Sequence, residues 1–179
     1  STIDMSYTEI IRFGTGIFID EDVEASSISY CNFDRNYIAI EDRGTGTEIS
    51  HCDFSGFLAM SPITTGIYQL GIKCYEASEF YYHDLLFDGW ITANTQGARD
   101  VDNKLKVALI EFTNIGWDAD INENEIRDCL FRNNEQMLRY AIRMTDSSPK
   151  FIDCSFNDDS DGEVFSYGVF NNDLNAPDD

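Results

Sequence analysis

Carboxylates are the most abundant side chains in this sequence that could take part in chemistry, because 33 Asp and Glu residues accompany only 12 Lys and Arg residues. Two carboxylates held about 6.5–9.5 Å apart can serve as general acid and general base of an inverting glycoside hydrolase. The candidates are Asp53 with Asp84 or Asp88, Glu111 with Asp128, and Lys73 as the base of an elimination reaction. With so many acids such pairs also arise by chance, and a solvated acidic face accounts for the same residues.

Acidic residues also gather in two loops, Asp20–Glu24 and Asn157–Glu163. Calcium binds six to eight oxygen ligands, and Asp159, Asp161 and Glu163 alternate as such a site requires. The spacing differs from an EF-hand, because the glycine and the last glutamate come too early. The loop is either a solvated acidic segment or a cation site, so no cofactor is required and calcium is the candidate.

Aromatic side chains are the third group with chemical potential. Flat rings with polar edges suit the apolar faces of sugars. Tyr75, Tyr81, Tyr82 and Trp90 fall within or beside the longest irregular stretch of the chain, and we expect them to form a ligand-binding surface for carbohydrate. Ordinary packing at the corners of the fold is the alternative.

The charge of the chain limits the partners it can bind. A formal net charge of −21 repels phosphate backbones and anionic lipids. We therefore expect no nucleic acid partner, and the apolar runs are too short for membrane insertion. Cations, neutral sugars and basic proteins are better partners, although the charge could also serve only to keep the protein soluble.

An internal repeat shows which elements must position these residues. The repeat is an aliphatic or aromatic residue, two residues, a Cys or another small or apolar residue, one residue, and usually Phe. Clear copies are Ile28–Phe33, Ile49–Phe54, Ile126–Phe131 and Phe151–Phe156, and weaker ones are Met5–Ile10, Tyr82–Phe87 and Val107–Phe112. Most copies lie 19–25 residues apart, near one turn of a β-solenoid.

The repeat predicts an all-β, right-handed, single-stranded parallel β-helix of about seven coils. We expect residues 1–170 to form this domain, with an insertion within about 55–84, and residues 171–179 to form a polar tail or linker. A bend before the Cys position resets the alternation, so that the first apolar residue, the Cys and the Phe all point inward. A leucine-rich repeat is the alternative fold, but the sequence is poor in Leu and rich in Phe at the marker positions.

Stacking of the coils predicts that like residues lie on like residues. The phenylalanines form one ladder, and Cys31, Cys52, Cys129 and Cys154 form another beside Leu85 and Ile110. Buried cysteines are usually packing residues. Disulfides between Cys31 and Cys52, or between Cys129 and Cys154, are geometrically conceivable as well, and the odd number of five cysteines leaves Cys74 unpaired.

The pattern Ile-x-x-Cys-x-Phe followed by Asn or Gly resembles the coil repeat of pectin-lyase-like right-handed β-helix proteins, from about Ile3 to Phe170. That fold includes lyases, hydrolases, phage tailspikes and adhesins. The resemblance does not extend to the motifs of polygalacturonase-like hydrolases. Asn94-Thr95-Gln96 lacks their acid, Gly71-Ile72-Lys73 lacks their arginine, and neither Gly-His-Gly nor a lyase motif is present.

We therefore expect a non-catalytic module of a secreted or cell-surface protein, a rigid spacer with a carbohydrate-binding or adhesion surface. The alternative is a segment of a polysaccharide-degrading enzyme, a glycoside hydrolase or a polysaccharide lyase, with carboxylates on the outer face of the solenoid. Solenoids expose strand edges at both ends. We accordingly expect neighbouring coils or protomers as partners at uncapped ends.

Overall fold

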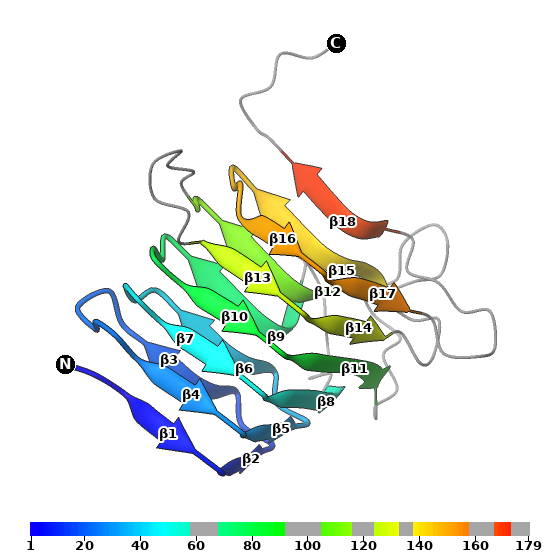
Figure 1. Cartoon of the computed structure of the whole chain (residues 1–179). Helices are drawn as coiled ribbons and strands as arrows, with labels where there is room; N and C mark the ends of the chain where they lie inside the picture. Colours follow the sequence, from blue (N-terminus) through cyan, green and yellow to red (C-terminus); the bar gives the residue numbers. More distant parts are fainter. Residues whose placement is uncertain (58–67, 92–104, 116–123, 133–137, 158–166, 173–179) are drawn as a thin grey trace.

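The structure, a computed structural model, describes residues 1–57, 68–91, 105–115, 124–132, 138–157 and 167–172. The chain is a right-handed parallel β-helix with three sheets of six parallel strands each. Each coil contributes one short strand to every sheet, so strands adjacent in a sheet come from successive coils (Figure 1). Steps of about 4.8 Å between parallel strands place the first and sixth strands of a sheet about 24 Å apart.

The strands follow one another in the same order in every coil. The first sheet contains β1 (Asp4–Ser6), β4 (Ser27–Ser29), β7 (Glu48–Ser50), β10 (Tyr81–His83), β13 (Glu125–Arg127) and β16 (Lys150–Ile152). The second sheet contains β2 (Glu9–Ile11), β5 (Asn32–Asp34), β8 (Asp53–Phe57), β11 (Leu86–Ile91), β14 (Leu130–Arg132) and β17 (Ser155–Asn157). The third sheet contains β3 (Thr15–Ile19), β6 (Ile38–Asp42), β9 (Tyr68–Tyr75), β12 (Leu105–Thr113), β15 (Leu138–Thr145) and β18 (Tyr167–Asn172).

A single residue with positive φ turns the chain from the first sheet into the second. This residue occupies the third position of the repeat in every coil, with φ between 51° and 53°; it is Tyr7, Tyr30, His51, Asp84, Asp128 and Asp153. The turn resets the alternation of side chains, so Ile28 and Cys31 both point inward and both are buried. The predicted bend before the Cys position is therefore confirmed.

The predicted phenylalanine ladder forms the centre of the core. Phe33, Phe54, Phe87, Phe131 and Phe156 stack with ring centroids 4.7–5.0 Å apart and nearly parallel planes. All but Phe156 are at most 1% exposed. Such a stack follows from the fold, because parallel in-register coils place the same repeat position at the same point of each coil.

One predicted copy of the repeat is wrong. Residues Val107–Phe112 lie in β12 of the third sheet, where they pair with β9 and β15. Phe87 therefore stacks directly on Phe131, and neither Phe112 nor Ile110 belongs to the two predicted ladders. The residue pattern alone does not distinguish the sheets, because an inward-facing apolar residue at every second position is common to all of them.

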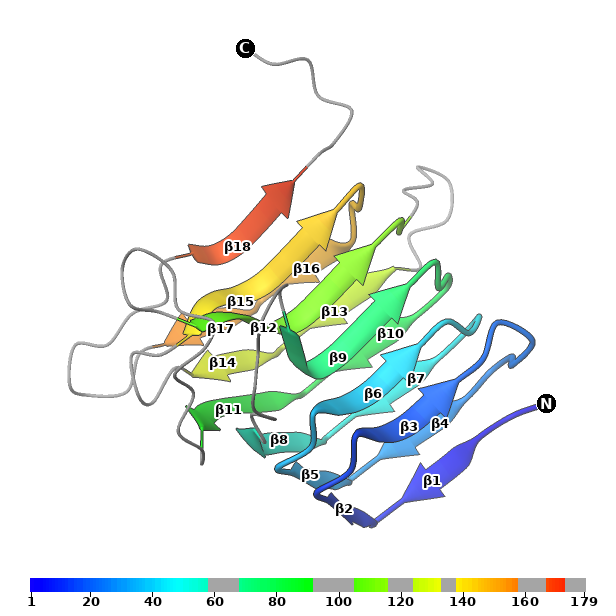
Figure 2. The ribbon, with the colours of Figure 1, turned by 180° about the vertical axis from the view of Figure 1, so that it is seen from behind.

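The connection from the second to the third sheet is longer in the last four coils than in the first two. The connection from the second to the third sheet comprises residues 58–67, 92–104, 133–137 and 158–166 in the last four coils, but only residues 12–14 and 35–37 in the first two. Residues 55–84, where an insertion was expected, contain two regular strands of the solenoid, β9, which is the counterpart of β6, and β10. Figure 2 shows the third sheet from behind, with its strands side by side from β3 to β18.

Candidate functional site

The outer face of the third sheet carries a row of charged side chains from four successive coils. Glu41, Lys73, Glu111 and Arg143 occupy the same register position on β6, β9, β12 and β15, and we call them the charged row. The residues beside them along each strand, such as Ile40, Ile72 and Ile142, are fully buried. The alternation of a strand therefore directs the charged row outward.

The charges of the row alternate in sign and pair along the stack. Lys73 Nζ lies 3.3 Å from Glu41 Oε1, and the same oxygen accepts a hydrogen bond of 2.6 Å from Arg43. Arg143 donates a hydrogen bond of 2.8 Å to Glu111 Oε1. Opposite charges that face each other on adjacent strands stabilise the pairing of those strands.

The two carboxylates of the row have opposite pKa shifts. Burial opposes ionisation of Glu41, but the hydrogen bond from Arg43 and the charge of Lys73 outweigh it and lower the pKa. For Glu111 burial is the larger effect and raises the pKa, despite the nearby charges of Arg143 and Lys73. Glu111 Oε2 is buried and has no hydrogen-bond partner. Such an oxygen is unusual in a folded protein, because buried polar atoms normally have a hydrogen-bond partner.

Aromatic side chains border the charged row. The guanidinium of Arg43 lies 5.4 Å from the ring centre of Phe18 and 5.3 Å from that of Tyr75. Phe18 is 48% exposed and lies in register with Glu41. The outer face of the third sheet thus combines exposed aromatic surface, guanidinium groups and carboxylates, which together can contact both the faces and the hydroxyls of a sugar.

A second group of side chains lies at the bend between the first and second sheets. The rings of Tyr7 and Tyr30 stack at 5.0 Å, and those of Tyr30 and His51 at 4.7 Å. His83 follows at 5.8 Å from His51 in an edge-on arrangement. Tyr30 is covered on both faces by Tyr7 and His51, whereas Tyr7 ends the stack and is 79% exposed.

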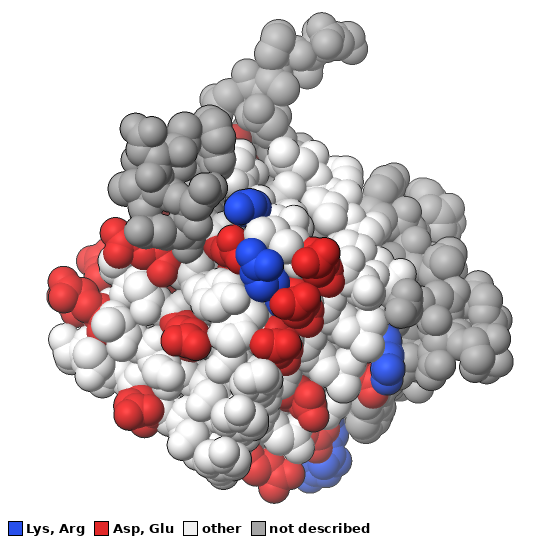
Figure 3. Space-filling view, viewed as in Figure 1, with Lys and Arg blue, Asp and Glu red and all other residues white. Residues whose placement is uncertain are grey.

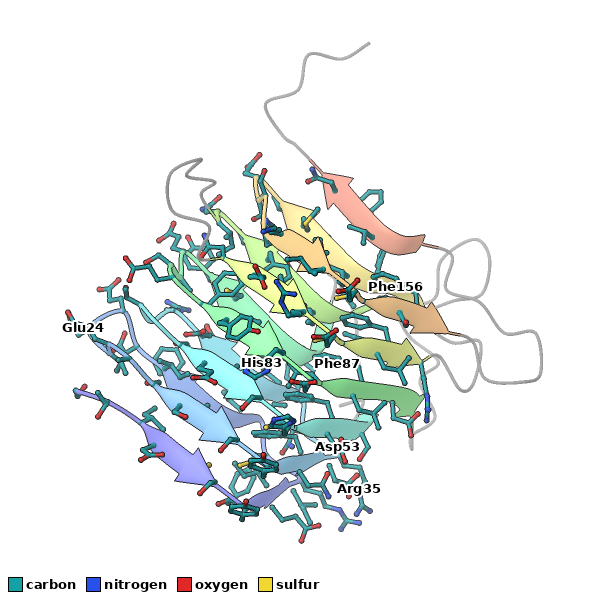
Figure 4. All side chains as sticks on the ribbon, in the orientation of Figure 1. Glu24, Arg35, Asp53, His83, Phe87 and Phe156 are labelled. Atoms are coloured by element: carbon teal, nitrogen blue, oxygen red, sulfur yellow. The ribbon has the colours of Figure 1, made fainter. Side chains whose placement is uncertain are left out.

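Acidic side chains surround the two histidines at this bend. His83 Nδ1 lies 2.7 Å from Asp84 Oδ2, and His83 Nε2 lies 3.1 Å from Glu48 Oε1. Figure 4 shows His83 and Asp53 on the same side of the solenoid, and Figure 3 shows that acidic side chains are spread over this face. Within the part of the chain that the structure describes, no group of three or more His, Cys, Asp or Glu side chains could hold a metal ion.

The four aromatic residues predicted to bind carbohydrate do not form one platform. Tyr82 is fully buried and its hydroxyl donates a hydrogen bond to Asp42 inside the core, so its placement on a binding surface was wrong. Tyr81 is 36% exposed and stacks on His83, whereas Tyr75 lies on the outer face of the third sheet. Trp90 lies in β11, but its side chain is outside the described part.

The candidate catalytic residues also lie on different faces. Lys73 belongs to the third sheet and pairs with Glu41. Asp53 and Asp88 lie on strands of the second sheet, and Asp84 lies at the bend before β11. The structure therefore does not bring Lys73 to the three acids. It likewise places Glu111 and Asp128 on different parts of the coil, and the loop acids Asp159, Asp161 and Glu163 lie outside the described residues.

Sequence reasoning missed the charged row, apart from Lys73 and Glu111 taken singly. An available signal was the alternation in Ile40-Glu41-Asp42 and Ile142-Arg143-Met144, where a charged residue follows an inward aliphatic one. That signal identifies outward positions, but it does not show which positions of distant segments share a register.

Comparison with protein-family models, with curated proteins and with solved structures gave no match. Among the described residues no helix has the length and hydropathy to cross a membrane.

Proposed function

We propose that the chain is a non-catalytic β-helix module of a secreted or cell-surface protein, a rigid spacer that binds carbohydrate on the outer face of its third sheet. The coils support the spacer role, since each strand between the ends of a sheet pairs on both sides. The observation that carries the binding role is the charged row next to the exposed Phe18 and the half-buried Tyr75. The resemblance to pectin-lyase-like proteins is part of the same proposal.

Pairing within the row favours binding over catalysis. Lys73 and Arg43 both contact Glu41, and Arg143 contacts Glu111, so each of these bases already has a carboxylate partner. A general base must instead be free to accept a proton near neutral pH. Charged groups held in this way can still donate and accept hydrogen bonds at sugar hydroxyls.

A glycan array followed by titration of the best sugars by calorimetry tests the proposal. We expect Tyr75→Ala and Lys73→Ala to weaken binding, since both change the outer face of the third sheet. Asp53→Ala is the matched control, because it removes an exposed residue from the second sheet. Absence of binding to any glycan by the folded chain would leave only the spacer role, and equal loss in the control would place the site elsewhere.

A polysaccharide hydrolase or lyase is the second candidate, favoured by one observation. Glu111 has a raised pKa and a buried oxygen without a partner, beside Arg143 and Lys73. A carboxyl group of this kind can act as a general acid. Plant and marine polysaccharides should be screened for new reducing ends and for the absorbance of unsaturated products, with Glu111→Gln as the inactive variant. Silence across a broad panel would remove this candidate.

A further inference from the structure

Two pairs of cysteines lie on neighbouring coils at the bend between the first and second sheets. Arg127 pairs with Ile152 and Leu130 with Ser155, so Cys129 lies beside Cys154 in the stack. The same register places Cys31 beside Cys52, and Cys31 N–H donates to Cys52 Sγ at 3.4 Å. In-register parallel strands about 4.8 Å apart lie within the Cα separation that a disulfide can span. All these cysteines are free thiols in the structure.

Access to solvent distinguishes the two pairs. Cys31 and Cys52 are 2% and 0% exposed, and Cys129 is 1% exposed. Cys154 is half-buried, so a small reagent can reach one member of its pair and neither member of the other. Exposure and thiolate character together decide which cysteines react.

The pKa shifts of the thiols follow the same order as their exposure, with Cys154 shifted down and the buried Cys129 and Cys52 shifted up. The neighbouring Cys129 thiol lowers the pKa of Cys154, against the effect of burial. The same interaction, together with burial, raises the pKa of Cys129. Burial raises the pKa of Cys52 to about 12, so this thiol remains protonated at neutral pH.

We propose that Cys154 and Cys129 form a redox-modification site, in which Cys154 reacts with low-molecular-weight disulfides and Cys129 then closes a disulfide between the fifth and sixth coils. The Cys154 thiolate attacks one sulfur of the small disulfide, its S–S bond breaks, and one small thiol leaves. Cys129 then loses its proton and attacks Cys154 Sγ, which releases the second small thiol. Two protein thiols are oxidised and one small disulfide is reduced to two thiols.

The bond would join the two coils covalently. Residues 129 and 154 bracket strands of all three sheets, from β14 through β16, so the cross-link closes a complete coil. Closing a loop lowers the entropy of the unfolded chain. Oxidation should therefore raise the Tm of the protein. This inference does not depend on carbohydrate binding, and its test leaves the third sheet unchanged.

Native chain incubated with oxidised glutathione, then quenched by acid and mapped by mass spectrometry, tests the site. We expect a product lighter by the mass of two hydrogens, with the Cys129 and Cys154 peptides linked. In the reduced protein, iodoacetamide at neutral pH should alkylate Cys154 roughly a hundredfold faster than Cys52. Equal alkylation rates for the two pairs, or no linked peptide in folded protein, would overturn the proposal.

Variants separate the two steps of the reaction. Cys129→Ala should retain one glutathione on Cys154, because the resolving thiol is missing. Cys154→Ala should gain none, and Cys52→Ala should form the link as the wild type does. Circular dichroism identifies any variant that fails to fold, and the alkylation map of the wild type needs no variant. A Cys129→Ala protein that folds and does not accumulate the adduct would contradict the first step.

Discussion

The aromatic rings inside the solenoid differ from those on its surface in burial, and hence in their contribution to stability. Phe54 is 1% exposed and stacks between Phe33 and Phe87. Truncating it removes apolar surface from the core and leaves a cavity between two coils. We expect Phe54→Ala to lower the free energy of unfolding by ~3–5 kcal/mol, measured by urea denaturation.

Phe13→Ala is the matched control for this measurement. Phe13 is 54% exposed, so its removal should change the free energy of unfolding by less than about 1 kcal/mol. Similar losses in the two variants would mean that the stack contributes no more than a surface ring.

Asp42 is a buried carboxylate whose proton affinity couples stability to pH. It is fully buried and accepts hydrogen bonds from Tyr82, from Thr47 and from the Gly44 N–H. Burial nevertheless raises its pKa above the ordinary value of 3.8. Between pH 3.8 and the raised pKa of the folded state, the folded protein binds more protons than the unfolded chain. The stability that comes from protonating Asp42 is therefore present below pH 3.8 and is lost as pH rises through the folded pKa.

Asp42→Asn removes this titration and leaves a side chain of the same shape. We expect the free energy of unfolding of the wild type to fall, relative to the variant, as pH rises above about 4. Urea denaturation across the acidic range measures the difference, and Asp53→Asn provides a control that changes an exposed carboxylate. Parallel curves for wild type and Asp42→Asn would show that the buried carboxyl group is not the source.

Among the structural elements, the bend between the first and second sheets has a non-glycine residue with positive φ in each of its six described copies. Asp128 has a φ of 52°, a conformation that costs roughly 1–2 kcal/mol for a residue with a Cβ and more for a β-branched one. We expect Asp128→Val to destabilise the protein by about 1–2 kcal/mol, whereas Asp128→Gly should be neutral or better. Thermal or urea unfolding of the two variants measures the effect.

Asp53→Val separates backbone strain from the loss of an acid. Asp53 is exposed and lies in the strand β8, where valine is a favourable residue. This control should therefore be close to neutral. A loss as large as that of Asp128→Val would assign the effect to the missing carboxylate rather than to the bend.

For the whole molecule, the charge of −21 is the dominant electrostatic property. Like charges on a compact rod repel one another, and salt screens that repulsion within a Debye length of about 8–10 Å. We expect the Tm to rise as sodium chloride increases from about 20 mM to about 500 mM. Differential scanning calorimetry measures the shift, and a falling Tm would mean that ion pairs such as those of the charged row outweigh the repulsion.

Calcium chloride at matched ionic strength distinguishes specific binding from screening. A rise in Tm beyond that seen with sodium chloride, abolished by the double variant Asp159→Asn and Asp161→Asn, would support the calcium site proposed from the sequence. Equal curves in the two salts would show that screening alone accounts for the effect.

The sequence by itself determined the parallel β-helix, the inward Phe and Cys positions and the bend between them. These follow from local periodicity, because Ile28, Cys31 and Phe33 recur in later copies with the same spacing. The predicted neighbours Cys31 with Cys52, and Cys129 with Cys154, are confirmed for the same reason.

Only the tertiary structure decided which segments share a sheet, and therefore what the surface presents. Val107–Phe112 matches the repeat in composition but pairs with β9 and β15, and Tyr82 is inside the core rather than on a binding surface. At least 32 residues of chain separate Glu41, Lys73 and Arg143 from one another. They form one row only because the coils stack in register. Periodicity specifies the direction of a side chain, whereas register between coils depends on packing that involves the entire chain.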